Sequence, residues 1–493
     1  MNRTAMLQNL QDVKEWDIII IGGGATGLGI AVDASSRGYK TLLLEQFDFG
    51  KGTSSRSTKL VHGGVRYLAQ GNIKLVMEAL RERGYLLKNA PHLTAKLAFI
   101  VPVYTLWDKF FYGVGLKLYD VLSGRLSIGK TRLLSKKSTQ QQLPGINAAA
   151  LKGGVLYYDG QFDDARLAIE LAVTAAKHNA SLINYCQVTG LQKENDTICG
   201  VTARDTITQQ TFSLRSKVVI NATGVFTDAV MKMDMPEDEP LVAPSQGIHL
   251  VVDRKFFPGN NAMMIPKTDD GRVLFAVPWH DKVVLGTTDT PVPDAAIEPK
   301  PLEEEIEFIL HHANRYLDAG ITRKDVRSMY AGLRPLVKQK HAKKTSVLSR
   351  DHVILISTTN LITITGGKWT TYRKMAEDVV NNAITTGSLP PRQCITKTLA
   401  IGSPMADGIK LLHNSFNLGE KDIRYFIEQE MAITVEDILA RRTRFLLLDA
   451  KAASAMAGTV ASTMAGIMQK DAAWVAAQVE SFTQLAKQYA GML

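Results

Sequence analysis

Cysteine is scarce in this sequence. The 493 residues include three, Cys186, Cys199 and Cys394, which lie far apart and form no C-x-x-C pair. Disulfide frameworks, iron–sulfur clusters and zinc ribbons need several cysteines at close, regular spacing. The sequence therefore argues against these three classes and predicts no metal site. So few cysteines fit a reducing location on the cytoplasmic side of a membrane.

Long apolar runs are also absent. Residues 1–15 are polar, without the apolar segment of a secretory signal peptide. The stretch that most resembles a membrane-spanning helix in length and apolarity is 452–469, which is uncharged but built mostly from small residues. Small residues suit close helix packing, so we expect this stretch to be buried inside a domain.

Signatures of nucleic-acid binding are missing as well, although the net charge is +10. The sequence has no zinc-finger spacing, no RNA-binding motif and no basic patch with interleaved aromatic residues. We expect no nucleic acid partner. An anionic membrane surface or an anionic small molecule remains as the partner of a basic chain.

A glycine-rich turn between a strand and a helix is the strongest motif present. Residues 17–21 form a β-branched run, residues 22–27 fit G-x-G-x-x-G, and helical spacing continues to residue 37. A second apolar strand, 41–44, then ends at Glu45, which can accept hydrogen bonds from a ribose. In such a unit the glycines allow a pyrophosphate to approach the helix N-terminus. The predicted dinucleotide contacts here are Gly22, Gly24, Ala25, Thr26, Gly27 and Glu45.

Three later segments extend this predicted cofactor site. Residues 47–59 form a loop rich in hydroxyl groups, which can hold a second part of the cofactor or can be a solvated linker. Two further buried strands, 217–221 and 360–365, end in Ala222-Thr223-Gly224 and Gly366-Gly367-Lys368. Extra glycine turns of this kind suit a permanently held FAD better than NAD. The predicted contacts are Ser54, Ser55, Thr58, Ala222, Thr223, Gly224, Gly366, Gly367, Lys368, Trp369 and Thr370.

The order of elements predicts an α/β fold of two or three domains. Strands alternate with helices around a parallel sheet, a strand-rich stretch follows from 244 to 289, and the chain beyond 389 is nearly all helical in composition. We expect a nucleotide-binding part at about 15–95, 150–243 and 345–388. It is interleaved with a β-rich substrate (cap) part at about 96–149 and 244–344. A helical domain covers 389–493, suited to packing, dimerisation or partner contact.

An apolar stripe with helical spacing lies within the first segment of the predicted substrate part. Its members are Trp107, Phe110, Phe111, Val114, Leu118, Val121 and Leu122, with basic residues close by. Such a helix can lie on a membrane surface, or it can face a core with its basic side in solvent. The pattern alone leaves both alternatives open.

Several separated motifs, taken in order, are similar to those of one family. They are residues 22–27, 57–68, 163–166, 221–224, 286–289, 332–336 and 366–374. The blocks His62-Gly63-Gly64-Val65-Arg66-Tyr67 and Gly366-Gly367-Lys368-Trp369-Thr370-Thr371-Tyr372-Arg373 are the most specific. Over residues 15–450 the sequence resembles the FAD-dependent glycerol-3-phosphate dehydrogenases.

The resemblance implies an FAD-binding, Rossmann-like parallel sheet with an inserted substrate domain and a helical C-terminal domain. It also implies oxidation of sn-glycerol 3-phosphate to dihydroxyacetone phosphate, with electrons passed to a quinone, ubiquinone or menaquinone. Respiratory members of the family work at the membrane surface. We therefore expect a homodimer in the cytoplasm, peripherally associated with the inner face of the cell membrane.

Oxidation of an alcohol by a flavin needs a base, and histidine suits this role near neutral pH. His62 lies four residues before Arg66 and five before Tyr67, and His249 lies within a predicted strand. A phosphate on the substrate calls for converging cations. Arg66, Tyr67, Arg334, Arg350 and Lys368 are the predicted substrate contacts, and Arg334 or Lys368 could also stabilise a developing alkoxide.

Two other functions fit the same residues. Arginine binds carboxylates as well as phosphates, so the enzyme could be a related flavin oxidoreductase acting on an amino or hydroxy acid. The chain could also be a non-catalytic module that holds a flavin and binds a partner. The related oxidoreductase differs from a glycerol-3-phosphate dehydrogenase in the substrate that it oxidises. Bleaching of the flavin on addition of glycerol 3-phosphate would exclude the non-catalytic module.

Overall fold

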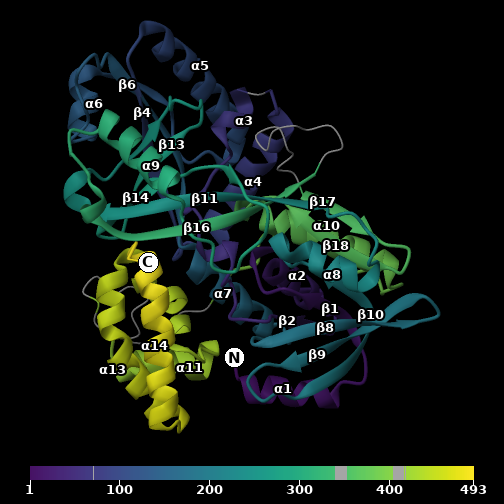
Figure 1. Cartoon of the computed structure of the whole chain (residues 1–493). Coiled ribbons are helices and arrows are strands. Elements are labelled where there is room, and N and C mark those ends of the chain that lie inside the picture. Colours follow the sequence, from purple (N-terminus) through teal and green to yellow (C-terminus); the bar gives the residue numbers. More distant parts are fainter. Residues whose placement is uncertain (70, 339–351, 403–415, 417, 493) are drawn as a thin grey trace.

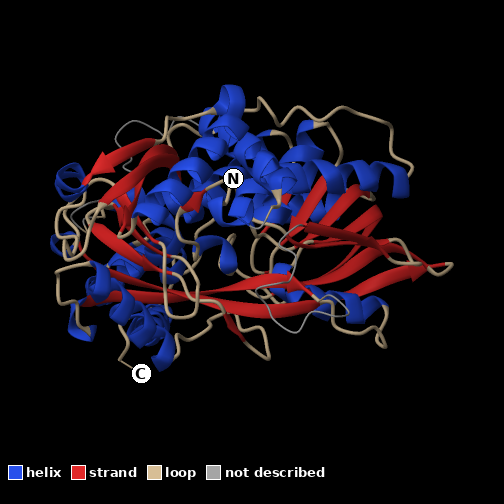
Figure 2. Ribbon diagram, turned by 90° about the horizontal axis from the view of Figure 1, so that it is seen from above, coloured by secondary structure: helices blue, strands red, loops and turns tan. Residues whose placement is uncertain are grey.

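The computed structural model describes residues 1–69, 71–338, 352–402, 416 and 418–492. Within these ranges the chain forms two sheets and a group of C-terminal helices (Figure 1). In the view of Figure 2, most helices crowd the upper half of the picture, and long strands cross the lower half. The predicted class, an α/β fold with a β-rich insertion and a helical C-terminal region, is confirmed.

The first sheet is the predicted nucleotide-binding sheet. Its central strands are parallel and β-branched, and their side chains are buried on both faces, as expected when helices cover a sheet on each side. The strand order is β17 (His352–Ile356), β18 (Leu361–Gly366), β10 (Thr211–Asn221), β1 (Trp16–Ile21), β2 (Thr41–Leu44) and β7 (Ser181–Ile183). The antiparallel strands β8 (Cys186–Glu194) and β9 (Thr197–Asp205) join it through β10.

Helices with one apolar face cover this sheet. Helix α2 (Ala25–Ser36) is almost entirely buried and packs between α7 (Asp164–Lys177) and α10 (Tyr372–Thr386). Their aliphatic side chains and those of the central strands form one continuous core. The other helices of this half include α1 (Arg3–Asp12), α4 (Ile73–Asn89) and α8 (Thr227–Asp234).

The second sheet is the predicted β-rich insertion. Its order is β15 (Thr290–Pro291), β11 (Val242–Asp253), β14 (Lys282–Gly286), β13 (Leu274–Trp279), β12 (Ala262–Ile265), β4 (Thr94–Val103), β6 (Gly153–Phe162) and β3 (Leu60–Val61). Strand β16 (Val326–Val337) pairs with β11, and β5 (Arg132–Ser135) pairs with β6. Helix α9 (Glu303–Tyr316) packs its apolar face on one side of the sheet. Strands β3 and β6 pair here, although the expected boundaries grouped their residues with the nucleotide-binding part.

The C-terminal region is helical, with α11 (Glu420–Glu430), α12 (Phe445–Leu448), α13 (Ala450–Met468) and α14 (Ala472–Tyr489). Helix α13 contains the small-residue stretch, and Ala453, Ala457 and Ala461 are buried against neighbouring elements as expected. The same apolar cluster includes residues of β4, β13 and β16, so these helices pack on the second sheet. In Figure 1 they form the yellow group, at the opposite end of the molecule from α5 (Leu106–Ser123).

Helix α5 decides between the two alternatives for the apolar stripe. Trp107, Phe110 and Val121 are 69%, 62% and 73% exposed, whereas Leu116 on the other side of the helix is fully buried. The stripe therefore faces solvent, and the core-facing alternative is wrong. Among the helices of the described ranges, none has the length and apolarity needed to cross a membrane.

Replacing a residue of this stripe should barely affect stability. We expect Val121→Ser to change the free energy of unfolding by less than ~0.5 kcal/mol, because the side chain loses few contacts. Leu116→Ala on the buried side should cost about 2–5 kcal/mol. Urea denaturation measures both variants, and equal losses would show that the stripe packs against the fold.

Candidate functional site

The glycine turn is closely packed against the next strand of the sheet. Gly22 has φ +107°, and a Cβ at this residue would lie 2.8 Å from the carbonyl oxygen of Ala222. A Cβ at Gly27 would lie 1.9 Å from the carbonyl oxygen of Gly22. No side chain fits at either residue, so the turn presents bare backbone at the N-terminus of α2. This is the cradle that a pyrophosphate needs.

Glu45 and Ser54 border this turn. The Glu45 carboxylate accepts hydrogen bonds from the backbone N–H groups of Gly23 at 2.6 Å and Phe47 at 2.8 Å. Burial raises the pKa of Glu45, and these two N–H groups oppose the shift. Ser54 Oγ accepts from the N–H of Ala25, in the first turn of α2, at 2.9 Å.

A cavity of about 350 Å³ follows the turn along the carboxyl ends of the strands. Most of the predicted cofactor residues line it: Gly22, Gly24, Ala25, Thr26, Glu45, Ser54, Ala222, Thr223, Gly224, Gly366, Gly367, Lys368 and Trp369. Gly27 instead makes the tight packing described above. Ser55 is buried, and its carbonyl oxygen accepts a hydrogen bond from Lys59 Nζ at 2.8 Å. The shape, the bare backbone and the acid fit the adenosine and pyrophosphate of a dinucleotide.

A second cavity, of about 230 Å³, continues from the first and shares Gly366, Gly367, Lys368 and Trp369 with it. It gathers the predicted chemistry from four separate segments of the chain. His62, Tyr67, His249, Arg334 and Lys368 all line it, together with Thr58 and Thr370. These five predicted residues therefore surround one cavity beside the nucleotide site.

Arg334 is fixed by the strands of the second sheet. Its guanidinium donates to the carbonyl oxygen of Thr288 at 2.9 Å and lies 3.2 Å from an Asp289 carboxylate oxygen. A Cβ at Gly247 would lie 2.3 Å from Arg334 Nη2, so the glycine makes room for the guanidinium. The planar group is thereby held in one orientation at the cavity wall.

His249 lies on β11 and is almost fully buried. Its Nε2 lies 2.8 Å from Thr58 Oγ1, and its ring stacks on Tyr330 with centroids 4.9 Å apart. Its Nδ1 has no hydrogen-bond partner among the residues that the structure describes. Burial, assisted by the positive charges of Lys59 and Arg334, holds the pKa of His249 well below 6.5. The ring is therefore neutral at pH 7 and can accept a hydrogen bond or a proton.

Lys368 and His62 also line the second cavity. The Lys368 ammonium lies 3.9 Å from the centroid of the Tyr67 ring, a cation–π contact. The backbone N–H of His62 donates to Thr370 Oγ1 at 3.2 Å, which ties the His62 turn to the segment after β18. The last glycine turn thus joins the cofactor cavity to the second cavity.

Two predicted substrate contacts stay untested. Arg66 lies in the short helix α3 (Val65–Ala69), but its side chain is not among those described. Arg350 lies outside the described residues. Three residues that hold the side chains of this cavity were not predicted as site residues. Thr288 and Asp289 contact Arg334, and Tyr330 stacks on His249. The 286–289 motif was a signal for the first two, whereas no pattern in the sequence indicates the Tyr330 stacking.

A third cavity, of about 570 Å³, connects this site with helix α5. It shares Thr58, His62, Tyr67 and Arg334 with the second cavity. Its walls are largely apolar, formed by Phe99, Phe110, Phe111, Leu116, Leu118, Tyr157, Met264 and Phe275. An apolar passage therefore runs from the cation-lined cavity to the exposed stripe.

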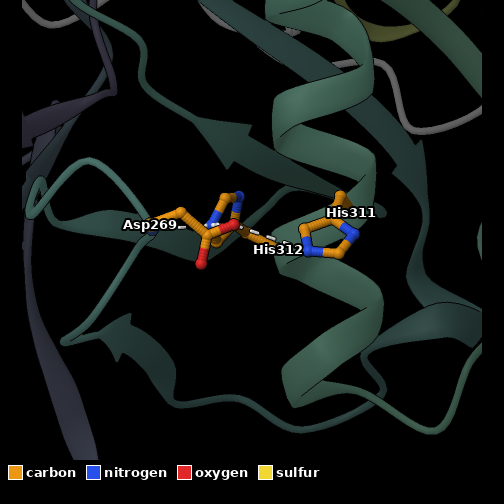
Figure 3. Close-up of side chains that lie close together, drawn as sticks. All are labelled: Asp269, His311 and His312. Atoms are coloured by element: carbon orange, nitrogen blue, oxygen red, sulfur yellow. Dashed lines mark hydrogen bonds and ion pairs between the residues drawn. The ribbon is translucent and has the colours of Figure 1, made fainter.

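Asp269, His311 and His312 lie close enough together to suggest a metal site (Figure 3). Both ring nitrogens of His312 are already engaged, Nδ1 with the Phe308 carbonyl at 2.8 Å and Nε2 with the Asp269 N–H at 3.0 Å. Arg315 also pairs with the Asp269 carboxylate at 3.0 Å. The cluster is a hydrogen-bonded contact between α9 and the loop before β13, and it is unsuited to a cation.

Comparison with known proteins agrees with this fold and with FAD as the cofactor. Residues 17–373 match the family described as FAD dependent oxidoreductase, and residues 357–475 match the C-terminal domain of alpha-glycerophosphate oxidase. The crystal structure of glycerol-3-phosphate dehydrogenase from Bacillus halodurans, complexed with FAD, has a TM-score of 0.80 and 27% identity. That comparison covers 100% of this chain and 98% of the other. Fold and site thus define an FAD-dependent oxidoreductase.

Sequence relatives narrow this class. The mitochondrial glycerol-3-phosphate dehydrogenase of Homo sapiens is 46% identical over 403 residues, which are 79% of this chain and 55% of that protein. The probable mitochondrial enzyme of Caenorhabditis elegans is 36% identical over 99% of this chain and 75% of its own length. The chain belongs to the glycerol-3-phosphate dehydrogenase family. It spans about half the length of the mammalian relatives it matches.

The buried, neutral His249 should make stability depend on pH. Its folded pKa is lowered, so below about pH 6.5 the unfolded chain takes up a proton that the folded chain does not. The free energy of unfolding should therefore fall on acidification, by up to ~1.4 kcal/mol per pH unit from this group. Urea denaturation of wild type and His249→Gln between about pH 7 and 5 measures the difference. Parallel curves for the two proteins would contradict it.

Proposed function

We propose that this chain oxidises sn-glycerol 3-phosphate to dihydroxyacetone phosphate with bound FAD and passes the electrons to ubiquinone or menaquinone at a membrane surface. The gathering of Arg334, Lys368, His62 and His249 around one cavity beside the nucleotide site carries this proposal. The names of the relatives support the same substrate. The expected homodimer stays a prediction.

FAD would lie along the glycine turn with its ring near residues 366–369, where it can accept a hydride at N5. Arg334 and Lys368 bring two positive charges to one small cavity, which suits a phosphate dianion. A substrate hydroxyl between them would lie near His62, which can accept its proton, and near His249, whose lowered pKa suits it better to accept a hydrogen bond. The same cations would stabilise the alkoxide as it forms.

An amino or hydroxy acid is the alternative substrate, because a carboxylate can also pair with Arg334. Two cations in one cavity favour a dianion over a monoanion, and this favours the phosphate. Anaerobic titration of the flavin spectrum tests the choice. Bleaching by glycerol 3-phosphate at concentrations where amino and hydroxy acids have no effect is expected, and the reverse preference would contradict the proposal.

Removing the Arg334 guanidinium should abolish turnover without removing the flavin. We expect Arg334→Ala to lose on the order of 2–5 kcal/mol of substrate binding and transition-state stabilisation, which lowers kcat/KM by at least about 30-fold. Arg334 does not line the first cavity, so the purified variant should stay yellow. A colourless variant would show that Arg334 holds the cofactor instead.

The electron acceptor is proposed from the third cavity and helix α5. An apolar passage that ends at an exposed aromatic stripe suits an apolar quinone that arrives from a lipid bilayer. Exposed basic residues such as Lys117, Arg125 and Arg132 lie on α5 or soon after it, where they can meet anionic headgroups. This supports peripheral contact with the inner face of the cell membrane.

Polar substitutions in the stripe should separate membrane-linked from water-linked turnover. We expect Trp107→Ser combined with Val121→Ser to weaken binding to anionic lipid vesicles and to lower quinone reduction by about tenfold. Reduction of a water-soluble dye should stay unchanged, because neither residue lines a cavity of the site. Ile207→Ser, an exposed apolar residue elsewhere, is the matched control. Equal losses with dye and quinone would contradict the membrane role.

A further inference from the structure

The C-terminal domain reaches the nucleotide cavity through Asp48. This residue lies in the loop after β2, and neighbouring loop residues from Glu45 to Ser54 line the cavity. The Asp48 side chain is fully buried between two arginines of the C-terminal domain. Arg441 Nε lies 2.5 Å from Asp48 Oδ2, and Arg442 pairs with both carboxylate oxygens. The loop that follows β2 is therefore held by residues that lie outside the nucleotide-binding sheet.

A second loop, the turn between β7 and β8, has the same anchor. Cys186, Gln187 and Val188, the first residues of β8, line the cavity beside Glu45. Just before them, the Tyr185 hydroxyl donates to Asp437 Oδ1 at 2.6 Å. The two loops also bond to each other, since the N–H of Cys186 donates to the Glu45 carbonyl at 2.8 Å. One segment of the C-terminal domain thus contacts both walls around Glu45.

This anchor is buried and strongly charged. Arg441 also pairs with Glu436 and Asp437, each at 2.7 Å, and Glu436 accepts from Lys51 of the first loop at 2.7 Å. Burial alone would raise the pKa of Asp48, but Arg442 and Arg441 lower it to about 2. Asp48 is therefore ionised at neutral pH. The planar, forked guanidinium of Arg441 holds three carboxylates in a fixed geometry, whereas a lysine offers one compact ammonium on a flexible stem.

We propose that residues 436–442 of the C-terminal domain form a clamp that fixes the two loops around the adenosine end of FAD and slows its release. Arg441 and Asp437 are positioning residues in this clamp, because they act through Asp48 and Tyr185 without lining the cavity. The inference rests on FAD as the cofactor. It does not depend on the substrate or on the electron acceptor.

The test compares two identical substitutions at the same domain junction. Arg441→Lys weakens the clamp, whereas Arg166→Lys weakens another buried ion pair with the C-terminal domain, to Glu430 at 2.7 Å. Arg166 contacts neither loop of the clamp by a hydrogen bond or ion pair in the described part of the chain. FAD release from the diluted holoenzyme is followed by recovery of flavin fluorescence, without substrate, and Tm is measured in parallel.

We expect Arg441→Lys to release FAD about tenfold faster than wild type, equivalent to ~1.4 kcal/mol. Arg166→Lys should release FAD at nearly the wild-type rate, even where its Tm falls as far. Equal acceleration in both variants, or none in Arg441→Lys, would overturn the clamp. The assay uses no substrate, so its result can be interpreted even if the proposed oxidation of glycerol 3-phosphate proves wrong.

Tyr185→Phe provides a milder variant in case Arg441→Lys does not fold. It removes only the hydroxyl that bonds Asp437, so the ring still packs and Tm should change little. FAD release should rise by several-fold through the loss of this one hydrogen bond to a charged group. A wild-type release rate in Tyr185→Phe would overturn the role of the second loop.

Discussion

The structure depends on the close approach of bare backbone at the carboxyl edge of a parallel sheet. β1, β2, β10 and β18 all end at this edge, and each is followed by a loop that lines the same cavity. Parallel pairing makes this convergence inevitable, because the carboxyl ends of parallel strands meet. Glycine at residue 22 then lets β1 and β10 bring their loops together without a side chain between them.

Loops of this kind have few hydrogen bonds of their own, so other parts of the chain must hold them. The loop after β2 is tied to the C-terminal arginines, and its Ser54 carbonyl accepts from the Trp369 indole at 2.8 Å. The His62 turn is tied to Thr370. Order at the site is therefore a property of contacts between segments far apart in sequence, not of the sheet alone.

This distinction explains what the sequence could predict. The G-x-G-x-x-G unit, the parallel strands and α13 follow from local periodicity and turn chemistry, and all three are confirmed. The pairing of Asp48 with Arg441 joins residues 393 apart, and no local pattern indicates it. The exposure of the α5 stripe was likewise undecided, because periodicity gives the faces of a helix and not the neighbour of each face. The membership of β6 in the second sheet depends on pairing with β4, which is also non-local.

The joined cavities change from polar, cation-lined walls beside the nucleotide site to largely apolar walls near α5. The second cavity places Arg334 and Lys368 beside largely apolar walls that begin at Tyr67. Cations near apolar surface are less screened than cations in water, so they attract an anion more strongly there. The same charges disfavour entry of other cations, while the walls that the third cavity adds toward α5 are mostly apolar and give an anion few partners. The polarity of the joined cavities therefore favours an anion beside Arg334 and Lys368, and an apolar molecule nearer to α5.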